Sequence, residues 1–178
     1  MADEVSVRLE LLSREHRALV AGFENDEPAL VTYLRRWALR HQERDGLGRT
    51  WLAIDEVDGE LRLAGFFSLA AASLERQLVT AGALDRLPRF PIPAVLLARL
   101  AVDQRVQGQG LGTWLFDEAL RKTLVLAAEG PIAVRVLVTD AKSERAAAFY
   151  ERKGLVRLTD GRWPCRMVLD LQPLLVGA

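Results

Sequence analysis

The apolar positions in the first part of the chain repeat with two different periods. Alternating apolar and polar residues predict a half-buried strand at residues 5–11. Two further strands are expected at 50–55 and 61–69, with a tight turn at 57–60 joining them. An apolar residue at every third or fourth position instead predicts a helix from residue 28 to about residue 44, opened by an Asp-Glu-Pro start. The expected order is strand, helix and hairpin.

The second part of the chain alternates between apolar strands and amphipathic helices. The pattern predicts a central strand at 94–102, a helix at 112–129, a strand at 132–138, a helix at 143–153, and a terminal strand pair at 155–158 and 165–171 with a turn at Asp160-Gly161. Residues 72–93 are expected to be irregular. The expected fold class is therefore α/β, a mixed sheet flanked by helices, in a single domain over residues 1–178.

The amino-acid composition limits which partners and which kinds of site the chain can be expected to have. Lys plus Arg equals Asp plus Glu at 24 each, so the net charge gives no reason to expect a polyanionic partner, although a local basic patch could still bind one. With one cysteine, Cys165, and two histidines, the chain has too few side chains for a disulfide or a Cys/His metal site, and we expect no metal. The start MADEVSVRLE is unlike a signal peptide, and no apolar run is long enough to span a bilayer. We therefore expect a cytoplasmic protein with no membrane partner.

Three glycines, Gly108, Gly110 and Gly112, separate the central strand from the long helix. Glycines at such a junction let backbone N–H groups at a helix start approach a phosphate closely. The P-loop motif is excluded because no Lys-Ser or Lys-Thr pair follows the last glycine. The dinucleotide-binding fingerprint does not fit, because the spacing is G-x-G-x-G and the glycines do not follow the strand directly. A loop that is only tight and closely packed is the alternative explanation.

The loop resembles a motif of a known superfamily. Residues 107–112, Q-G-Q-G-L-G, resemble the acyl-CoA pyrophosphate loop Q/R-x-x-G-x-G/A of the GNAT superfamily of N-acetyltransferases. Residues 143–155, S-x-x-A-x-x-F-Y-x-x-x-G-L, resemble a second signature of the same superfamily, at the separation that one helix and one strand require. Stretches at 23–42, 65–70 and 93–103 resemble the toxin-like branch from bacterial toxin–antitoxin pairs, whose known members acetylate aminoacyl-tRNA.

The resemblance implies the acyl-CoA N-acyltransferase fold with acetyl-CoA as co-substrate and no metal. Backbone groups at the strand end would hold the pantetheine arm and the thioester, and those of the loop would hold the pyrophosphate. The implied cofactor-binding residues are Leu100, Ala101 and Val102 on the strand, Gln107, Gly108, Gln109, Gly110, Leu111, Gly112 and Thr113 in the loop, and Ser143, which stands where the family usually has Asn. Ser143 would serve equally well as a helix N-cap alone.

Tyr150 is the catalytic residue that the resemblance implies. A phenol with a reference pKa of about 10 can hydrogen-bond the thioester sulfur and protonate the departing thiolate. The alternative is a tyrosine packed at a helix end with its hydroxyl in water. Some relatives carry a Glu base at the position of Val138. Here solvent, another group, or a substrate bound as the free base must therefore account for the amine proton.

Arginines repeat along one face of the helix predicted at residues 28–44. Arg35, Arg36 and Arg40 form, with Arg44, a basic ridge that suits phosphate groups. The family resemblance makes Arg35, Arg36 and Arg40 candidate substrate contacts. The same pattern also describes an ordinary solvated face with acidic neighbours.

The function that the resemblance implies is transfer of an acetyl group from acetyl-CoA to the α-amino group of aminoacyl-tRNA. It further implies a ribbon-helix-helix antitoxin as a protein partner, and pairing through the terminal strands would give a homodimer. Two alternatives stay open. One is the same scaffold acetylating a small-molecule or protein amine, which the neutral net charge favours. The other is a non-catalytic acyl-CoA-binding module.

Overall fold

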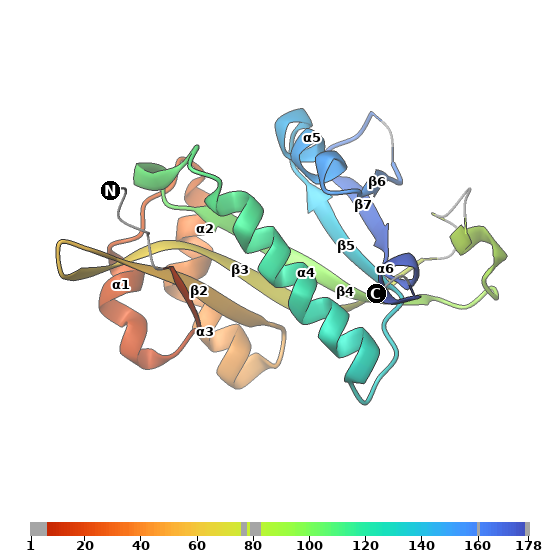
Figure 1. Cartoon of the computed structure of the whole chain (residues 1–178), viewed down its shortest axis with the longest axis horizontal. Coiled ribbons are helices and arrows are strands. Elements are labelled where there is room, and N and C mark those ends of the chain that lie inside the picture. The colour runs from red at the N-terminus through yellow and green to blue at the C-terminus, as the bar shows by residue number, and fades with distance from the viewer. Residues whose placement is uncertain (1–6, 76–77, 79–82, 160, 177–178) are drawn as a thin grey trace. The chain divides into compact units, whose positions relative to one another are not determined.

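The computed structural model describes residues 7–75, 78, 83–159 and 161–176 (Figure 1). The chain divides into two compact units. The first unit comprises Met1–Ala70 and Arg99–Ala119, and the second comprises Ala71–Ala98 and Leu120–Ala178. The expectation of a single domain over residues 1–178 stays a prediction.

The strands form a mixed sheet in the order β1-β2-β3-β4-β5-β7-β6. They are β1 (Arg8–Leu11), β2 (Arg49–Val57), β3 (Glu60–Leu74), β4 (Ile92–Val102), β5 (Val136–Ala141), β6 (Val156–Arg157) and β7 (Cys165–Asp170). β2 is antiparallel to β1 and β3, β4 is parallel to β5, and β7 is antiparallel to β5 and β6. The mixed sheet with flanking helices confirms the predicted fold class.

The described residues also form helical segments. They are η1 (Arg14–His16), α1 (Arg17–Ala21), α2 (Pro28–Thr32), η2 (Tyr33–Trp37), α3 (Ala38–Arg40), η3 (His41–Asp45), η5 (Ala83–Arg86), η6 (Gln104–Val106), α4 (Leu111–Glu129), α5 (Glu144–Arg152) and α6 (Gln172–Val176). The helices predicted at 112–129 and 143–153 are confirmed as α4 and α5. The helix predicted from residue 28 is also confirmed, as a continuous helical stretch that ends before Gly46, whose φ of 65° is left-handed.

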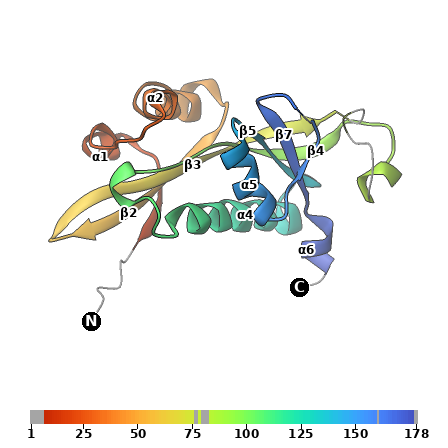
Figure 2. The same ribbon diagram turned by 90° about the horizontal axis from the view of Figure 1, so that it is seen from above.

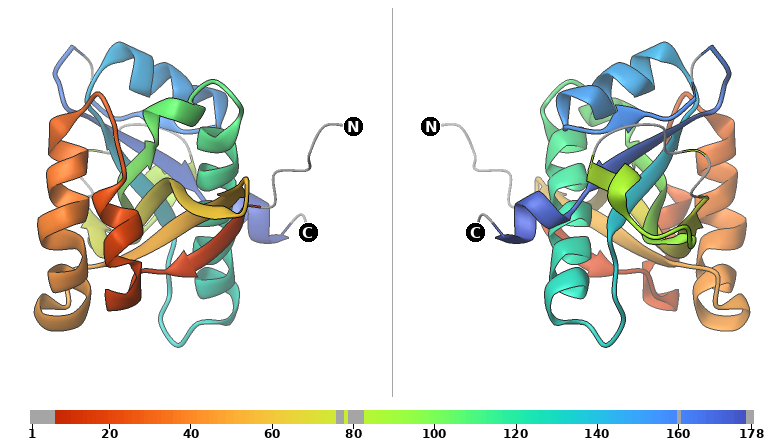
Figure 3. Two further views of the ribbon diagram at one scale, coloured as in Figure 1. Left: turned by 90° about the vertical axis from the view of Figure 1, so that its left-hand side faces the viewer. Right: turned by 90° about the vertical axis from the view of Figure 1, so that its right-hand side faces the viewer.

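In the first unit, helices lie on both faces of β2 and β3. Helices α1 and α2 cover one face, and the beginning of α4 lies against the other (Figure 2 and the left view of Figure 3). Phe23, Leu34, Leu52 and Phe66 are all fully or almost fully buried in the cluster beneath α1 and α2. Burying these large apolar side chains fixes the helices to the sheet.

The hairpin between β2 and β3 closes where the sequence predicts. Val57 pairs with Glu60, and the two residues between them, Asp58 and Gly59, have φ values of 52° and 81°. Two left-handed residues form the type I′ turn whose twist matches paired strands, and Asp-Gly suits it because both residues tolerate positive φ.

In the second unit, β4 and β5 form the parallel pair, with Ala94 opposite Val136. Helix α5 packs against β5 and β7, as seen in the right view of Figure 3. The core of this unit contains the buried side chains of Leu74, Ile92 and Val168. The parallel strand–helix–strand crossover predicted from the sequence is therefore present as β4, α4 and β5.

Three predicted strand boundaries were wrong. β3 continues to Leu74 and β4 begins at Ile92, so part of the segment expected to be irregular is paired sheet. β5 begins at Val136 instead of residue 132; Ile132 is 60% exposed in the loop after the Gly-Pro pair, where no neighbouring strand buries it. The first two residues of the strand expected at 5–11, and Asp160 of the expected terminal turn, lie outside the described residues.

The described residues include neither a helix that could span a membrane nor a cluster of metal-ligating side chains. None of the helices in this part of the chain combines the length and the apolar character that a membrane span requires. The same residues contain no group of three or more His, Cys, Asp or Glu side chains that could hold a metal ion. The thiol of Cys165 is buried and donates to the carbonyl oxygen of Thr159 at 2.9 Å.

Candidate active site

The glycine loop joins β4 to α4 in the first unit. Gly108 and Gly110 have φ values of 79° and 84°, and a side chain built at either one would meet no atom within 4 Å. Glycine is therefore required here by backbone conformation and not by crowding. Trp114 donates its backbone N–H to the carbonyl oxygen of Gly110 at 3.1 Å, which begins the α4 ladder. The N–H groups of Leu111, Gly112 and Thr113 precede this bond at the helix start, where backbone donors have no intrahelical acceptor. Such a start favours an anion, as a pyrophosphate site requires.

Gly112 and Gly65 are glycines for different reasons. A Cβ at Gly112 would lie 3.7 Å from Val102 Cγ2, an ordinary van der Waals distance, so the protein itself leaves room there. A Cβ at Gly65 would lie 2.7 Å from Leu115 Cδ1 and 2.8 Å from the carbonyl oxygen of Ala101. Gly65 therefore lets β3 approach both the end of β4 and the beginning of α4, which sets the position of the loop between them.

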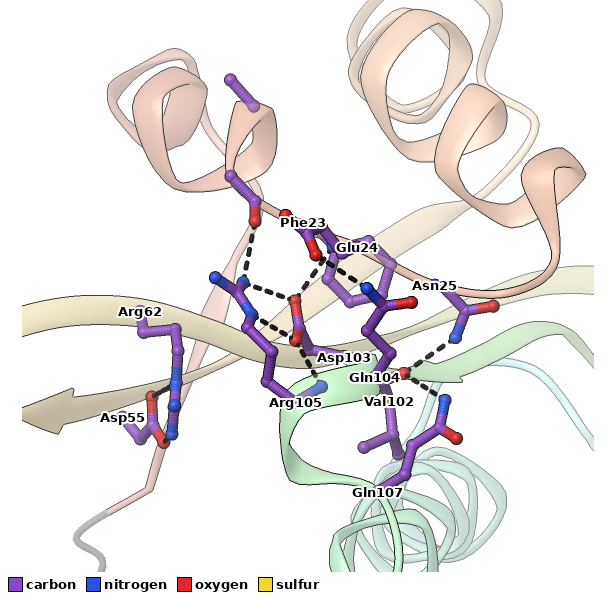
Figure 4. Close-up of polar contacts among 12 residues, drawn as sticks. Phe23, Glu24, Asn25, Asp55, Arg62, Val102, Asp103, Gln104, Arg105 and Gln107 are labelled. Atoms are coloured by element: carbon purple, nitrogen blue, oxygen red, sulfur yellow. Dashed lines mark hydrogen bonds and ion pairs between the residues drawn. The ribbon is translucent and has the colours of Figure 1, made fainter.

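A buried aspartate precedes the loop (Figure 4). Asp103 is 0% exposed and accepts four hydrogen bonds: from the backbone N–H of Glu24 at 2.9 Å, and from Arg105 through its backbone N–H at 3.0 Å, Nε at 2.7 Å and Nη2 at 2.7 Å. Burial opposes the charge of this carboxylate most strongly, but the bonds from Arg105 and Glu24 together outweigh burial and hold the pKa of Asp103 below its usual range. Asp103 is thus a charged anchor for the turn that enters the loop.

The segment that follows α1 is tied to the same place (Figure 4). Arg105 Nη2 donates to the carbonyl oxygen of Gly22 at 2.8 Å, and Gln104 donates from its backbone N–H to the carbonyl oxygen of Glu24 at 2.9 Å. Asn25 Nδ2 donates to the carbonyl oxygen of Val102 at 2.8 Å. The contacts of Asp103 with Glu24, of Arg105 with Gly22 and of Asn25 with Val102 were not predicted, because these partners are distant in the sequence. The only signal was that V-D and F-E-N-D-E-P lie within the stretches that resemble the family.

The strand residues expected to meet the co-substrate lie at the end of β4. Ala101 is buried in the core of the first unit, whereas Leu100 and Val102 are half-buried. The carbonyl oxygen of Val102 accepts from Asn25 and also from Gln107 Nε2, at 3.3 Å. The side chain of Gln107 therefore fastens the loop to the strand, and a role for it in holding co-substrate stays a prediction.

Tyr150 lies in α5 of the second unit and is 9% exposed. Burial raises the pKa of its phenol, and a hydrogen bond with Thr139 acts in the opposite direction without cancelling that rise. Thr139 Oγ1 also donates to the carbonyl oxygen of Leu97 at 2.9 Å. A tyrosine with its hydroxyl in bulk water is thus not what the structure shows. A phenol kept protonated at neutral pH suits a proton donor.

Ser143 begins α5 as a helix cap. Its Oγ accepts from the backbone N–H of Ala146 at 3.3 Å, which satisfies one donor of the first turn. The capping role that the sequence allowed is confirmed, and a contact of Ser143 with co-substrate stays a prediction.

The arginines of the ridge differ in whether their side chains bond other groups of the protein. Arg35 Nη2 donates to the carbonyl oxygens of Ala21 and Phe23 at 2.8 and 2.9 Å, which completes the C-terminal end of α1. Arg40 Nε donates to Asp45 at 3.1 Å. Arg36, in contrast, has no ion-pair partner among the described residues.

A basic cavity of about 480 Å³ adjoins this ridge in the first unit. Its lining includes six arginines and a single acid, Glu43, which pairs with Arg14 at 3.0 Å. The six arginines are Arg14, Arg17, Arg35, Arg36, Arg40 and Arg44. The chain as a whole is neutral, so the charge is concentrated locally on this face.

Known proteins resemble this chain over most of its length. The family model for the acetyltransferase (GNAT) domain matches residues 46–156. A tRNA-acetylating toxin of Mycobacterium tuberculosis (strain ATCC 25618 / H37Rv) is 36% identical over 131 residues, which cover 74% of this chain and 74% of that protein.

Solved structures of similar fold agree with these matches. A tyrosine-to-phenylalanine mutant of KacT has a TM-score of 0.83 and 25% identity, covering 97% of this chain and 99% of that one. AtaT complexed with acetyl-methionyl-tRNAfMet has a TM-score of 0.81 and 22% identity, covering 96% and 98%. A mutant AtaT toxin bound to acetyl-CoA and the C-terminus of the antitoxin AtaR has a TM-score of 0.73 and 23% identity, covering 96% of each chain.

Proposed function

Because this chain belongs to the GNAT acetyltransferase family, as an N-acetyltransferase that uses acetyl-CoA, we propose that its acceptor is the α-amino group of an aminoacyl-tRNA. The observation that carries this proposal is the 36% identity with a tRNA-acetylating toxin over 74% of both chains. The basic cavity supports it, since six arginines on one face of a neutral protein provide a local site for phosphates.

The glycine loop fits the pyrophosphate of acetyl-CoA. Gly108 and Gly110 adopt the left-handed conformation that exposes the start of α4, and the helix dipole there favours negative charge. The loop residues Gln107–Thr113 would hold the phosphates, and backbone groups of Leu100, Ala101 and Val102 would hold the pantetheine arm. Ser143 would add a contact at the start of α5.

Tyr150 is the proposed general acid. The neutral α-amino group attacks the thioester carbonyl carbon, a C–N bond forms, and the C–S bond breaks with its electron pair remaining on sulfur. The Tyr150 hydroxyl gives its proton to that thiolate, and the proton lost by the amine goes to the resulting phenolate or to solvent. An α-amino ester has a lower pKa than a lysine side chain, so more of it is neutral without a dedicated base.

The same family membership supports further proposals about context. We propose an antitoxin of the ribbon-helix-helix type as partner, a homodimer, and a cytoplasmic location. Support for the antitoxin comes from AtaT, a fold neighbour that was solved with the C-terminus of the antitoxin AtaR.

A thiol-release assay tests the acceptor. The protein is mixed with acetyl-CoA and a thiol-reactive dye, and then with charged tRNA, deacylated tRNA, or a panel of small amines and lysine peptides. We expect CoA release with charged tRNA and none with deacylated tRNA, which lacks the amine. Release only with small amines or peptides would contradict the tRNA proposal, and acetyl-CoA binding without release under any condition would indicate a non-catalytic binding module.

A further inference from the structure

A row of aromatic rings runs along the helical stretch that follows α2. Tyr33, Trp37 and His41 recur at every fourth residue; the ring centroids of Tyr33 and His41 are 5.8 Å apart, and those of Trp37 and His41 are 6.1 Å apart. Tyr33 also stacks on the buried Phe66 at 6.4 Å, with 19° between the ring planes. This aromatic stripe, defined as Tyr33, Trp37 and His41, is thus anchored in the core at one end.

The backbone of this stretch is unusual. Two of its segments, Tyr33–Trp37 and His41–Asp45, are π-helical, and the three residues between them are α-helical. π-Turns are rare, and they occur frequently at functional sites because they turn side chains out of the ordinary helical register. All three residues of the stripe belong to these π-segments: Tyr33 and Trp37 bound the first, and His41 begins the second. Trp37 is also 43% exposed, which a purely structural aromatic row does not require.

Guanidinium groups lie over these rings. Arg99 Cζ of β4 is 4.8 Å from the ring centroid of Tyr33, and Arg40 Cζ is 5.7 Å from that of Trp37. Arg40 also lines the basic cavity, so the stripe and the cavity are continuous through this one side chain. In the described part of the chain, the cavity arginines Arg17, Arg36 and Arg44 have no ion-pair partner.

We propose that the aromatic stripe is a stacking platform for the unpaired 3′ end of the acceptor tRNA, with a base on the exposed ring of Trp37 and the phosphates on the neighbouring arginines. Single-stranded RNA is held in this way, by aromatic faces for the bases and a positively charged groove for the backbone. An acidic peptide would satisfy the arginines but would leave the exposed ring of Trp37 without a matching partner. The inference rests on the proposed function for its ligand, and binding can be measured without turnover.

The test is binding of a fluorescein-labelled ACCA tetranucleotide, followed by anisotropy at fixed salt. We expect Trp37→Ala to weaken binding roughly tenfold or more, because each stacked base contributes substantially to affinity. Trp37→Phe should restore most of it. Trp163→Ala is the matched control, since Trp163 is 46% exposed and belongs to the other unit, and it should bind as the wild type does. Thermal unfolding of each variant checks that it is folded.

Three results would overturn the platform: no binding of ACCA by the wild type, equal binding by Trp37→Ala, or equal binding of an abasic tetranucleotide of the same charge. A hexaglutamate peptide that binds more tightly than ACCA, and depends on Trp37, would point to a protein partner and would also overturn it. Failure of the proposed function would give a different result, because charged tRNA would then not be acetylated. Binding of ACCA and its dependence on Trp37 would still show whether the stripe acts as a stacking platform.

Discussion

The glycine loop of the first unit and the tyrosine of α5 in the second unit present two different ways of building a site. The loop offers backbone N–H groups and is held in place by a buried ionic anchor, Asp103 with Arg105. Tyr150 offers one hydroxyl on a regular helix, held by burial and by Thr139. Binding by the loop is therefore spread over many backbone atoms, whereas the chemistry proposed for Tyr150 depends on a single oxygen. Substitutions in the two regions should affect different quantities.

The largest expected effect separates chemistry from binding. Tyr150→Phe removes only the hydroxyl, so kcat should fall roughly 100-fold or more, as is typical when a general acid is lost. The Kd for acetyl-CoA, measured by calorimetry, should stay within about twofold because the loop is untouched. A weakened Kd with an unchanged kcat would make Tyr150 a structural residue and would remove the contrast between the two regions.

The second prediction concerns the anchor beneath the loop. Asp103→Ala removes a buried carboxylate with four hydrogen bonds, and the free energy of unfolding should fall by about 2–4 kcal/mol. Acetyl-CoA affinity should fall as well, because the turn that enters the loop loses its support. Urea unfolding and calorimetry measure the two effects.

Asp55→Ala is the matched control for this anchor. Asp55 is 2% exposed and is also paired with an arginine, Arg62, but on the β2–β3 hairpin (Figure 4). It should cost similar stability without changing acetyl-CoA affinity. If both variants weaken acetyl-CoA binding equally, the effect is one of general stability and the anchor has no specific role.

The contribution of Asp103 to the free energy of unfolding should depend on pH. The pKa of Asp103 is lower in the folded protein than in the unfolded chain, so the unfolded chain takes up the proton more readily. The stabilisation by Asp103 is therefore complete above the unfolded pKa of about 3.9 and is lost as the pH falls through the folded pKa. In urea unfolding, wild type and Asp103→Asn should differ by a constant amount from pH 5 to 7, and the difference should begin to shrink as the pH falls below about 4, disappearing only below the folded pKa. A difference that does not shrink below about pH 4 would contradict the assignment.

Two glycines of the loop provide a finer test. Gly110→Ala places a side chain at a φ of 84° and should lower the free energy of unfolding by about 1–3 kcal/mol. Gly112→Ala meets only Val102 Cγ2 at 3.7 Å and should leave stability within about 0.5 kcal/mol of the wild type. Both should weaken acetyl-CoA binding, the second by blocking close approach of the ligand. Full affinity in Gly112→Ala would show that no ligand comes near that position.

The smallest expected effect comes from substituting Thr139, which forms a hydrogen bond with Tyr150. Thr139→Val removes the hydroxyl that bonds Tyr150 and Leu97, at a cost of about 1 kcal/mol in stability and a several-fold fall in kcat. Thr139→Ser keeps the hydroxyl and should restore kcat. An equal fall in both variants would mean that only the methyl packing matters.

The features that the sequence predicted correctly are those decided locally. Asp58-Gly59 forms its turn, Ser143 caps its helix, and Gly108 and Gly110 mark the loop because only glycine tolerates those φ values readily. The end of β3 at Leu74 could not be predicted in this way, since strand pairing depends on distant neighbours.

The sequence also did not predict which groups the side chains would bond, because many of these partners are distant in the chain. Arg35 was expected on an open ridge, yet it is engaged with carbonyl oxygens of Ala21 and Phe23. Asp103 accepts a hydrogen bond from the backbone N–H of Glu24, which lies 79 residues earlier in the chain. The π-segments, Tyr33–Trp37 and His41–Asp45, arise within a pattern that reads as an ordinary helix, because an apolar stripe does not specify which carbonyl each N–H will bond.

The most direct test of the central claim is identification of the product. Charged tRNA is incubated with acetyl-CoA and the protein, and is then digested with a nuclease that releases the terminal aminoacyl-adenosine for mass spectrometry. We predict an aminoacyl-adenosine heavier by one acetyl group, with fragmentation placing that group on the α-amino nitrogen, and far less of it with Tyr150→Phe over the same time. An unmodified aminoacyl-adenosine from a preparation that releases CoA with another amine would contradict the account.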